Sequence, residues 1–136
     1  MGVEEKRVLA TRIIEGFINK NNPVVADELF ADDFVNHSPQ YVVSPDRDGL
    51  KQMIALLHHG FPDIQFILDD SIVENDKVVL RMRCTGKHKG EFIGIQPTNK
   101  SIDTSSISIL RLENGKVKER WNVTNQLETM QQLGLM

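Results

Sequence analysis

The sequence predicts an α+β fold in which a curved antiparallel β-sheet wraps around N-terminal helices and forms a cone with a central pocket. Apolar residues recur at three- and four-residue spacings early in the chain and at two-residue spacings later. The pair Asn114-Gly115 separates two alternating segments, which is typical of a two-residue β-hairpin. Helices followed by hairpin-linked strands indicate a sheet that packs one face against a helical layer.

Composition bounds the class of protein. A chain of 136 residues fits one domain, expected here over residues 1–136. The single cysteine, Cys84, excludes a disulfide framework and predicts a cytoplasmic location. No apolar run approaches a membrane span, and the net charge of −3 argues against a nucleic-acid surface. We therefore expect neither a membrane nor a nucleic acid as partner.

Three helices are expected before the sheet. Residues 3–21 carry an amphipathic stripe, and Asn22-Pro23 reads as an N-cap and first-turn proline for a second helix that runs through Phe30. A cap and first-turn proline at residues 44–46 begin a third helix, which ends at Gly60.

Strands are expected over residues 64–73, 78–87 and 102–112, with a short strand or arm at 34–39. The long strands should bend, and glycines offer places for β-bulges. These glycines are Gly86, Gly90 and Gly94.

The last strand follows the hairpin, and a final helix is expected to begin near Leu127. Alternation predicts that one set of its side chains shares the pocket face. That set is Val117, Glu119, Trp121, Val123 and Asn125. Alternation along the expected strand at 78–87, when it is extended by one residue, places His88 on the more apolar face of that strand.

Several motifs together resemble one family. The central block matches a glycine-rich pattern at Gly86, His88, Gly90, Phe92, Gly94, Ile95, Pro97, Thr98 and Lys100. Further matches lie at residues 34–39, 61–63, 115–121 and 132–134. On these motifs the chain resembles the SnoaL-like polyketide cyclases, small members of the α+β cone superfamily named after nuclear transport factor two.

The resemblance implies intramolecular aldol condensation, or related isomerase or lyase chemistry, without a metal or organic cofactor. Asn125 stands where the family's catalytic aspartate is expected. An asparagine has no titratable proton near neutral pH, but it can donate a hydrogen bond to a carbonyl or enolate oxygen. We therefore expect His88 and Asn125 as the catalytic pair, with His88 in proton transfer. The alternative for His88 is a structural brace at the bend of the sheet.

The expected substrate is a hydrophobic small molecule such as a polycyclic polyketide. The side chains expected to bind it are His37, Asn36, Trp121, Phe92, Met82 and Met53. Trp121 would wall the pocket or belong to the core, and His37 would touch the ligand or serve only structure.

The rival function is a non-catalytic ligand-binding or dimerisation module of the same fold. Both functions predict a homodimer through the outer face of the sheet, because several apolar side chains fall out of phase with the pocket face. These side chains are Ile67, Val79, Ile107 and Ile109.

Overall fold

The computed structural model describes residues 1–136, and its elements follow the predicted order of helices and then strands. They are α1 (Val3–Arg12), the π-helical segment η1 (Ile13–Ile18), α2 (Pro23–Leu29), β1 (Phe30–Asn36), α3 (Arg47–Gly60), β2 (Gln65–Glu74), β3 (Lys77–Lys87), β4 (Ser101–Glu113), β5 (Lys116–Thr124) and α4 (Gln126–Gln132). None of the helices combines the length and the apolar character that crossing a bilayer requires.

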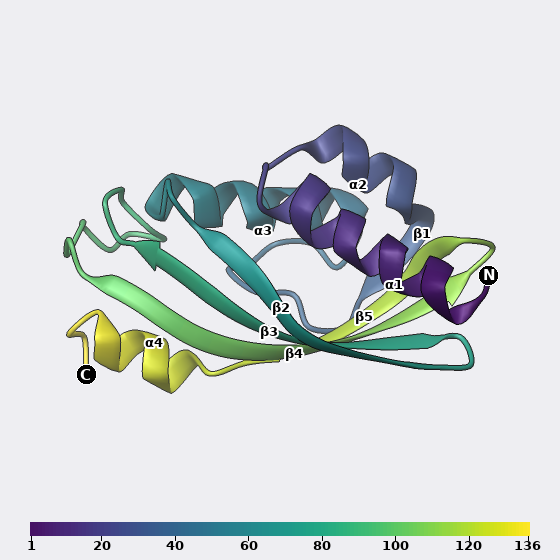
Figure 1. Cartoon of the computed structure of the whole chain (residues 1–136). Coiled ribbons are helices and arrows are strands. Elements are labelled where there is room, and N and C mark those ends of the chain that lie inside the picture. The colour runs from purple at the N-terminus through teal and green to yellow at the C-terminus, as the bar shows by residue number, and fades with distance from the viewer.

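One five-stranded sheet organises the fold, with the strand order β1-β5-β4-β3-β2. Neighbouring strands are antiparallel except β1 and β5, which pair in parallel. The strongly twisted sheet carries α1, α2 and α3 over one face (Figure 1). The predicted α+β cone is therefore confirmed, with one parallel pair added at its edge.

The short helix α4 lies apart from the others, beside the end of β4 that is far from the N-terminus (Figure 1). Gln132 fixes it there, because its side chain accepts a hydrogen bond from the Asp103 amide (2.7 Å) and donates one to the Asp103 carbonyl (2.9 Å). These bonds satisfy the edge of β4 beyond the last residue of β5.

Side-chain caps explain where two helices begin. The Asn22 side chain accepts a hydrogen bond from the Val24 amide (3.2 Å), and Pro23 opens α2 as predicted. Asp46 caps α3 by accepting a hydrogen bond from the Gly49 amide (2.8 Å). Pro45 therefore precedes this cap, which corrects its predicted place in the first helical turn.

The core lies between the helical layer and the sheet. Its larger part contains the edge-to-face pair Phe17 and Phe30, with ring centroids 5.9 Å apart. A smaller cluster surrounds Phe61 beneath the loop that follows β3. On the opposite face of the sheet, Ile107 is 49% exposed, as its phase predicted.

The strand pairing shifts register at three places, between Phe30 and Val35 in β1 and at two bulges, and none of them uses a glycine. The pairing of β2 with β3 skips Asp69, and the pairing of β5 with β4 skips Lys118. Gly86 instead pairs regularly with Ile102, whereas residues 90 and 94 lie in the loop between β3 and β4. The prediction of glycine bulges was therefore wrong.

The bulge at Lys118 reverses the predicted facing of β5. Val117 is fully buried and pairs with Leu112, but beyond the extra residue Arg111 pairs with Glu119. An added residue moves each later side chain to the opposite face, because side chains alternate along a strand. The predicted pocket face is therefore wrong for Glu119, Trp121, Val123 and Asn125. The side chains that face inward are Arg120, Asn122 and Thr124.

Candidate functional site

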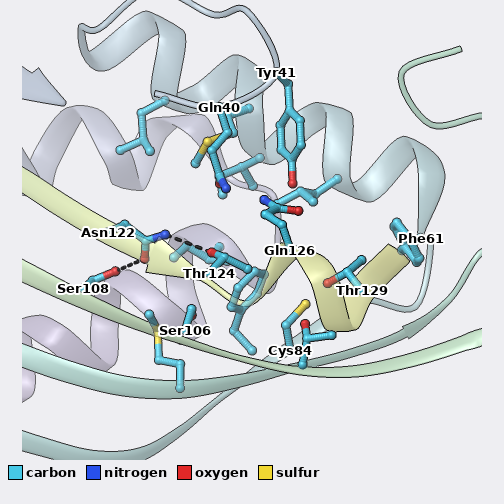
Figure 2. A pocket seen from close by; sticks show the side chains of 18 of the residues that line it. Gln40, Tyr41, Phe61, Cys84, Ser106, Ser108, Asn122, Thr124, Gln126 and Thr129 are labelled. Atoms are coloured by element: carbon cyan, nitrogen blue, oxygen red, sulfur yellow. Dashed lines mark hydrogen bonds between the residues drawn. The ribbon is translucent and has the colours of Figure 1, made fainter. Parts of the chain in front are cut away.

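A cavity of about 130 Å³ lies between the helices and the sheet (Figure 2). An engineered cavity of about 150 Å³ in another protein holds one benzene molecule, so the two cavities are similar in size. Pockets for larger ligands usually occupy about 300 to 1,000 Å³. In this conformation the cavity therefore has room for about one ring of a ligand.

One wall of the cavity is apolar. Phe17 reaches it from η1, Met53 and Leu57 reach it from α3, and Phe92 reaches it from the loop after β3. A wall of this composition favours a ligand with a hydrocarbon surface, because each ligand methylene group removed from water contributes about 0.8 kcal/mol to the free energy of binding.

The opposite wall is polar and comes from β4 and β5. Ser108 donates a hydrogen bond to the Asn122 side-chain oxygen (2.6 Å), and Asn122 donates one to the Thr124 hydroxyl (2.9 Å; Figure 2). Ser106 and Thr104 continue this wall along β4. Hydroxyl and amide groups on adjacent strands can therefore hydrogen bond to oxygen atoms on one edge of a ligand.

Three titratable side chains line the cavity: Tyr41, Cys84 and Arg120. Burial raises the pKa of Tyr41, although its hydrogen bond with Gln126 opposes the shift, and burial raises the pKa of Cys84 to about 12. Burial lowers the pKa of Arg120 to about 10. At neutral pH the cavity therefore holds a neutral phenol, a neutral thiol and a cation, and no carboxylate or histidine lines it.

Asn36 holds the Arg120 guanidinium from the neighbouring strand. Asn36 and Arg120 are register partners in the parallel pair of β1 and β5, and Arg120 Nη1 donates a hydrogen bond to Asn36 Oδ1 (3.2 Å). Asn36 is only 1% exposed, and its Nδ2 has no hydrogen-bond partner. The cation is therefore oriented by a neutral amide.

Tyr41 meets α4 at one side of the cavity. Its hydroxyl lies next to Gln126 (Figure 2). Its ring packs edge-on against Phe92, with centroids 5.1 Å apart. Tyr41 and Val42 both have left-handed backbone conformations, with φ of 61° and 58°. This conformation is unfavourable for a β-branched residue such as Val42, so the segment is strained.

The structure places the predicted site residues in three different environments. Met53, Met82 and Phe92 line the cavity, whereas Asn36 lies behind Arg120. The predicted roles of all four in ligand binding stay predictions.

His88 is fully buried but does not line the cavity. Its ring stacks on Phe61 at 5.2 Å, and its Nδ1 accepts a hydrogen bond from the Thr98 amide (3.2 Å). Its backbone also pairs with Lys100 and Asn99 across the loop. This arrangement matches the structural brace considered above, although His88 Nε2 has no partner. A role in proton transfer stays a prediction.

Asn125 and Trp121 lie outside the cavity because of the bulge. Asn125 caps α4 by accepting a hydrogen bond from the Glu128 amide (3.1 Å). Trp121 stacks on His37 with ring centroids 4.8 Å apart, and His37 pairs with Glu119 (3.1 Å). These side chains belong to the outer side of the sheet and to its junction with α4.

Arg120, Asn122 and Tyr41 line the cavity but were not among the predicted site residues. The serines of β4 offered a signal, because Ser106 and Ser108 interrupt the inward apolar phase of that strand. A closed apolar core seldom contains several polar side chains on one strand, so polar residues at inward positions indicate the wall of a pocket. No group of His, Cys, Asp and Glu side chains is arranged as ligands for a metal ion.

Comparisons with known proteins agree with this architecture. The family profile of the SnoaL-like polyketide cyclases matches residues 8–133. The structure is similar to TsrD from Streptomyces laurentii, with 24% identity, a TM-score of 0.90 and coverage of 100% of this chain and 99% of that one.

Two further structures carry provisional polyketide cyclase assignments. A Bacillus cereus protein is 27% identical with a TM-score of 0.85, over 97% of this chain and 82% of that one. IdmH from Streptomyces antibioticus is 25% identical with a TM-score of 0.83, over 94% of this chain and 97% of that one. The comparison with curated proteins finds no match. Since the profile spans nearly the whole sequence, the chain belongs to the SnoaL-like polyketide cyclase family.

Proposed function

We propose that the protein binds a hydrophobic small molecule with oxygen atoms along one edge and acts on it as a cofactor-independent cyclase. The observation that carries this proposal is the opposition of an apolar helical wall to the polar wall of β4 and β5. Polyketides have this character, because carbonyl and hydroxyl groups alternate with hydrocarbon along their chains.

The polar wall suits one part of cyclase chemistry. In an aldol ring closure, a carbon next to a carbonyl loses a proton, and the resulting enolate carbon attacks a second carbonyl within the same molecule. Donors fixed beside the enolate oxygen stabilise the charge that develops there. Asn122, the Tyr41 hydroxyl and the Arg120 guanidinium are among the donors that line this cavity.

Proton removal needs a base, and no carboxylate or histidine lines the cavity. The proposal therefore favours substrates whose reacting C–H lies between two carbonyls, since such a proton is acidic before the enzyme contributes. Because Nδ1 accepts a hydrogen bond from the Thr98 amide, the Nε2 of a neutral His88 ring carries the proton. His88 would therefore serve as the base only if a movement broke this bond and brought an unprotonated ring nitrogen to the substrate.

The absence of a carboxylate also favours the second candidate, a non-catalytic ligand-binding module. Incubation with a panel of aromatic β-keto esters separates the two functions. Formation of cyclised product above the uncatalysed rate supports the cyclase. Saturable binding without product supports the module, and no binding of any panel member contradicts both.

A matched pair of variants tests the polar wall. Asn122→Leu removes amide donors inside the cavity, whereas Asn125→Ala removes an amide outside it. We expect Asn122→Leu to weaken β-keto ester binding by about 2- to 12-fold, the usual range for one hydrogen bond. Asn125→Ala should leave the affinity unchanged. Equal losses in the two variants would count against the assigned wall.

We also propose a homodimer through the outer face of the sheet. Ile67 and Ile107 are exposed on this face, with Val79 and Ile109 partly exposed beside them. Burying them against a second copy would remove apolar surface from water. Sedimentation at micromolar concentration should show a dimer that Ile107→Glu dissociates, and a monomeric wild type would contradict this part of the proposal.

A further inference from the structure

We propose that Arg120, oriented by Asn36, forms a subsite for a carboxylate group, so that the natural ligand is a hydrophobic carboxylic acid bound in its ionised form. This inference rests on the proposed binding function of the same cavity and names the chemical class of its ligand.

Arg120 is the one arginine of the chain without an acidic partner. The chain has seven arginines, and the other six form ion pairs with aspartate or glutamate. Removing a cation from water is costly unless an opposite charge compensates it. No acidic side chain lines the cavity, and its phenol and thiol are neutral at pH 7. The counter-ion is therefore absent from the protein itself.

The guanidinium still has donors to offer. Its only hydrogen bond to the protein runs from Nη1 to Asn36 Oδ1. Its other nitrogens are not among the fully buried atoms without a partner, which are Asn36 Nδ2 and His88 Nε2. They therefore keep accessible surface, and Arg120 lines the cavity. Parallel donors of this kind match the two oxygens of a carboxylate.

Asn36 orients the cation without neutralising it. Its Oδ1 accepts hydrogen bonds from Arg120 Nη1 (3.2 Å) and from the Ser38 amide (3.0 Å), which fixes the orientation of the side-chain amide. An aspartate at this position would supply a permanent counter-ion. The neutral amide therefore leaves the positive charge free, and it lies buried behind the guanidinium, outside the lining of the cavity.

The apolar wall completes the recognition of such a ligand. A single aromatic ring suits a cavity of about 130 Å³, and the wall formed by Phe17 and Met53 would receive it. A charged head with an aromatic body is therefore the chemistry that this cavity complements.

The test compares trans-cinnamate with methyl cinnamate, which share one ring and differ in charge. Calorimetric titration of the full chain at pH 7 should show cinnamate binding at least about tenfold more tightly than its ester, the effect expected of a charge-assisted hydrogen bond. Arg120→Met should abolish this preference and retain ester binding. The control Arg81→Met removes an arginine that is paired with Asp69, and it should keep the preference.

A second variant guards against a fold defect in Arg120→Met. Asn36→Asp places a carboxylate beside the guanidinium at unchanged size, so it should also abolish the preference for cinnamate while the ester still binds. Equal affinity of wild type for both ligands, or a preference that survives in Asn36→Asp or in folded Arg120→Met, would overturn the carboxylate subsite and leave the binding function standing. If neither ligand binds wild type, the binding function is overturned together with the subsite.

Discussion

The loop between β3 and β4 and the strand β5 both carry motifs of the family, but they contribute differently to the cavity. The loop seals His88 into the core and sends only apolar side chains such as Phe92 to the cavity. Strand β5 sends Arg120, Asn122 and Thr124 inward. The difference shows that membership of a motif does not decide whether a side chain meets a ligand, because backbone register decides it.

The largest expected effect tests the register of β5. Deleting Lys118 removes the bulge and forces one end of β5 to face the wrong side, so either Val117 leaves the core or Arg120 leaves the cavity. We expect loss of cooperative unfolding, measured by circular dichroism during heating. The control Lys118→Ala keeps the bulge and removes only an exposed ion pair with Asp33, so it should leave the stability nearly unchanged. A deletion variant as stable as this control would contradict the role of the bulge.

The next prediction concerns His88 as a brace. His88→Ala should lower the free energy of unfolding by about 3 kcal/mol, because it removes a fully buried ring packed on Phe61. Thr98→Val, which removes only the hydroxyl beside Nδ1, should cost about 1 kcal/mol. Urea denaturation measures both. If the two variants bind β-keto esters like wild type while still folded, the loop is structural; loss of turnover with intact binding would restore His88 as a proton-transfer group.

Alkaline pH tests the floor of the cavity, where Cys84 lies. Burial raises its pKa from 9.0 to about 12, so above pH 9 the thiol ionises in the unfolded chain before it ionises in the folded protein. The contribution of the neutral Cys84 thiol to the free energy of unfolding is therefore fully present below pH 9. It falls as the pH rises toward 12, by at most about 1.4 kcal/mol per pH unit. Arg120 acts in the opposite direction above pH 10.

The useful window for this measurement is therefore pH 8 to 10. Urea denaturation should show a decline in wild type that is smaller in Cys84→Ala. An identical decline in the two proteins would show that Cys84 does not titrate as burial requires.

The smallest effect belongs to Asn125, which lies at the end of β5 but caps α4. Asn125→Ala should cost about 1 kcal/mol, the usual value of an N-cap, whereas Asn125→Asp should be nearly neutral because aspartate caps equally well. Turnover assays should show no gain in Asn125→Asp. A large gain in turnover would show that an aspartate at position 125 can act as the catalytic acid or base.

The sequence was sufficient to predict the element types and their order, because helical periodicity, strand alternation and Asn114-Gly115 are local signals. It was insufficient for the facing of β5. One phase buries Glu119 and the other buries Arg120, so charge does not discriminate between them. The bulged residue, Lys118, is an ordinary surface residue and leaves no trace in the pattern. Every site prediction that depended on this strand changed accordingly.

The strained segment at Tyr41 and Val42 has a consequence for the time course of binding. A ligand larger than one ring needs more room than the cavity of about 130 Å³ offers, and Tyr41 is one of the side chains that would have to move to provide it. Val42 is fully exposed at 106%, so no packing offsets its unfavourable backbone, and opening the segment would release strain of about 1 kcal/mol or more. For such ligands the observed association rate would stop rising at high concentration and level off at the rate at which this segment moves.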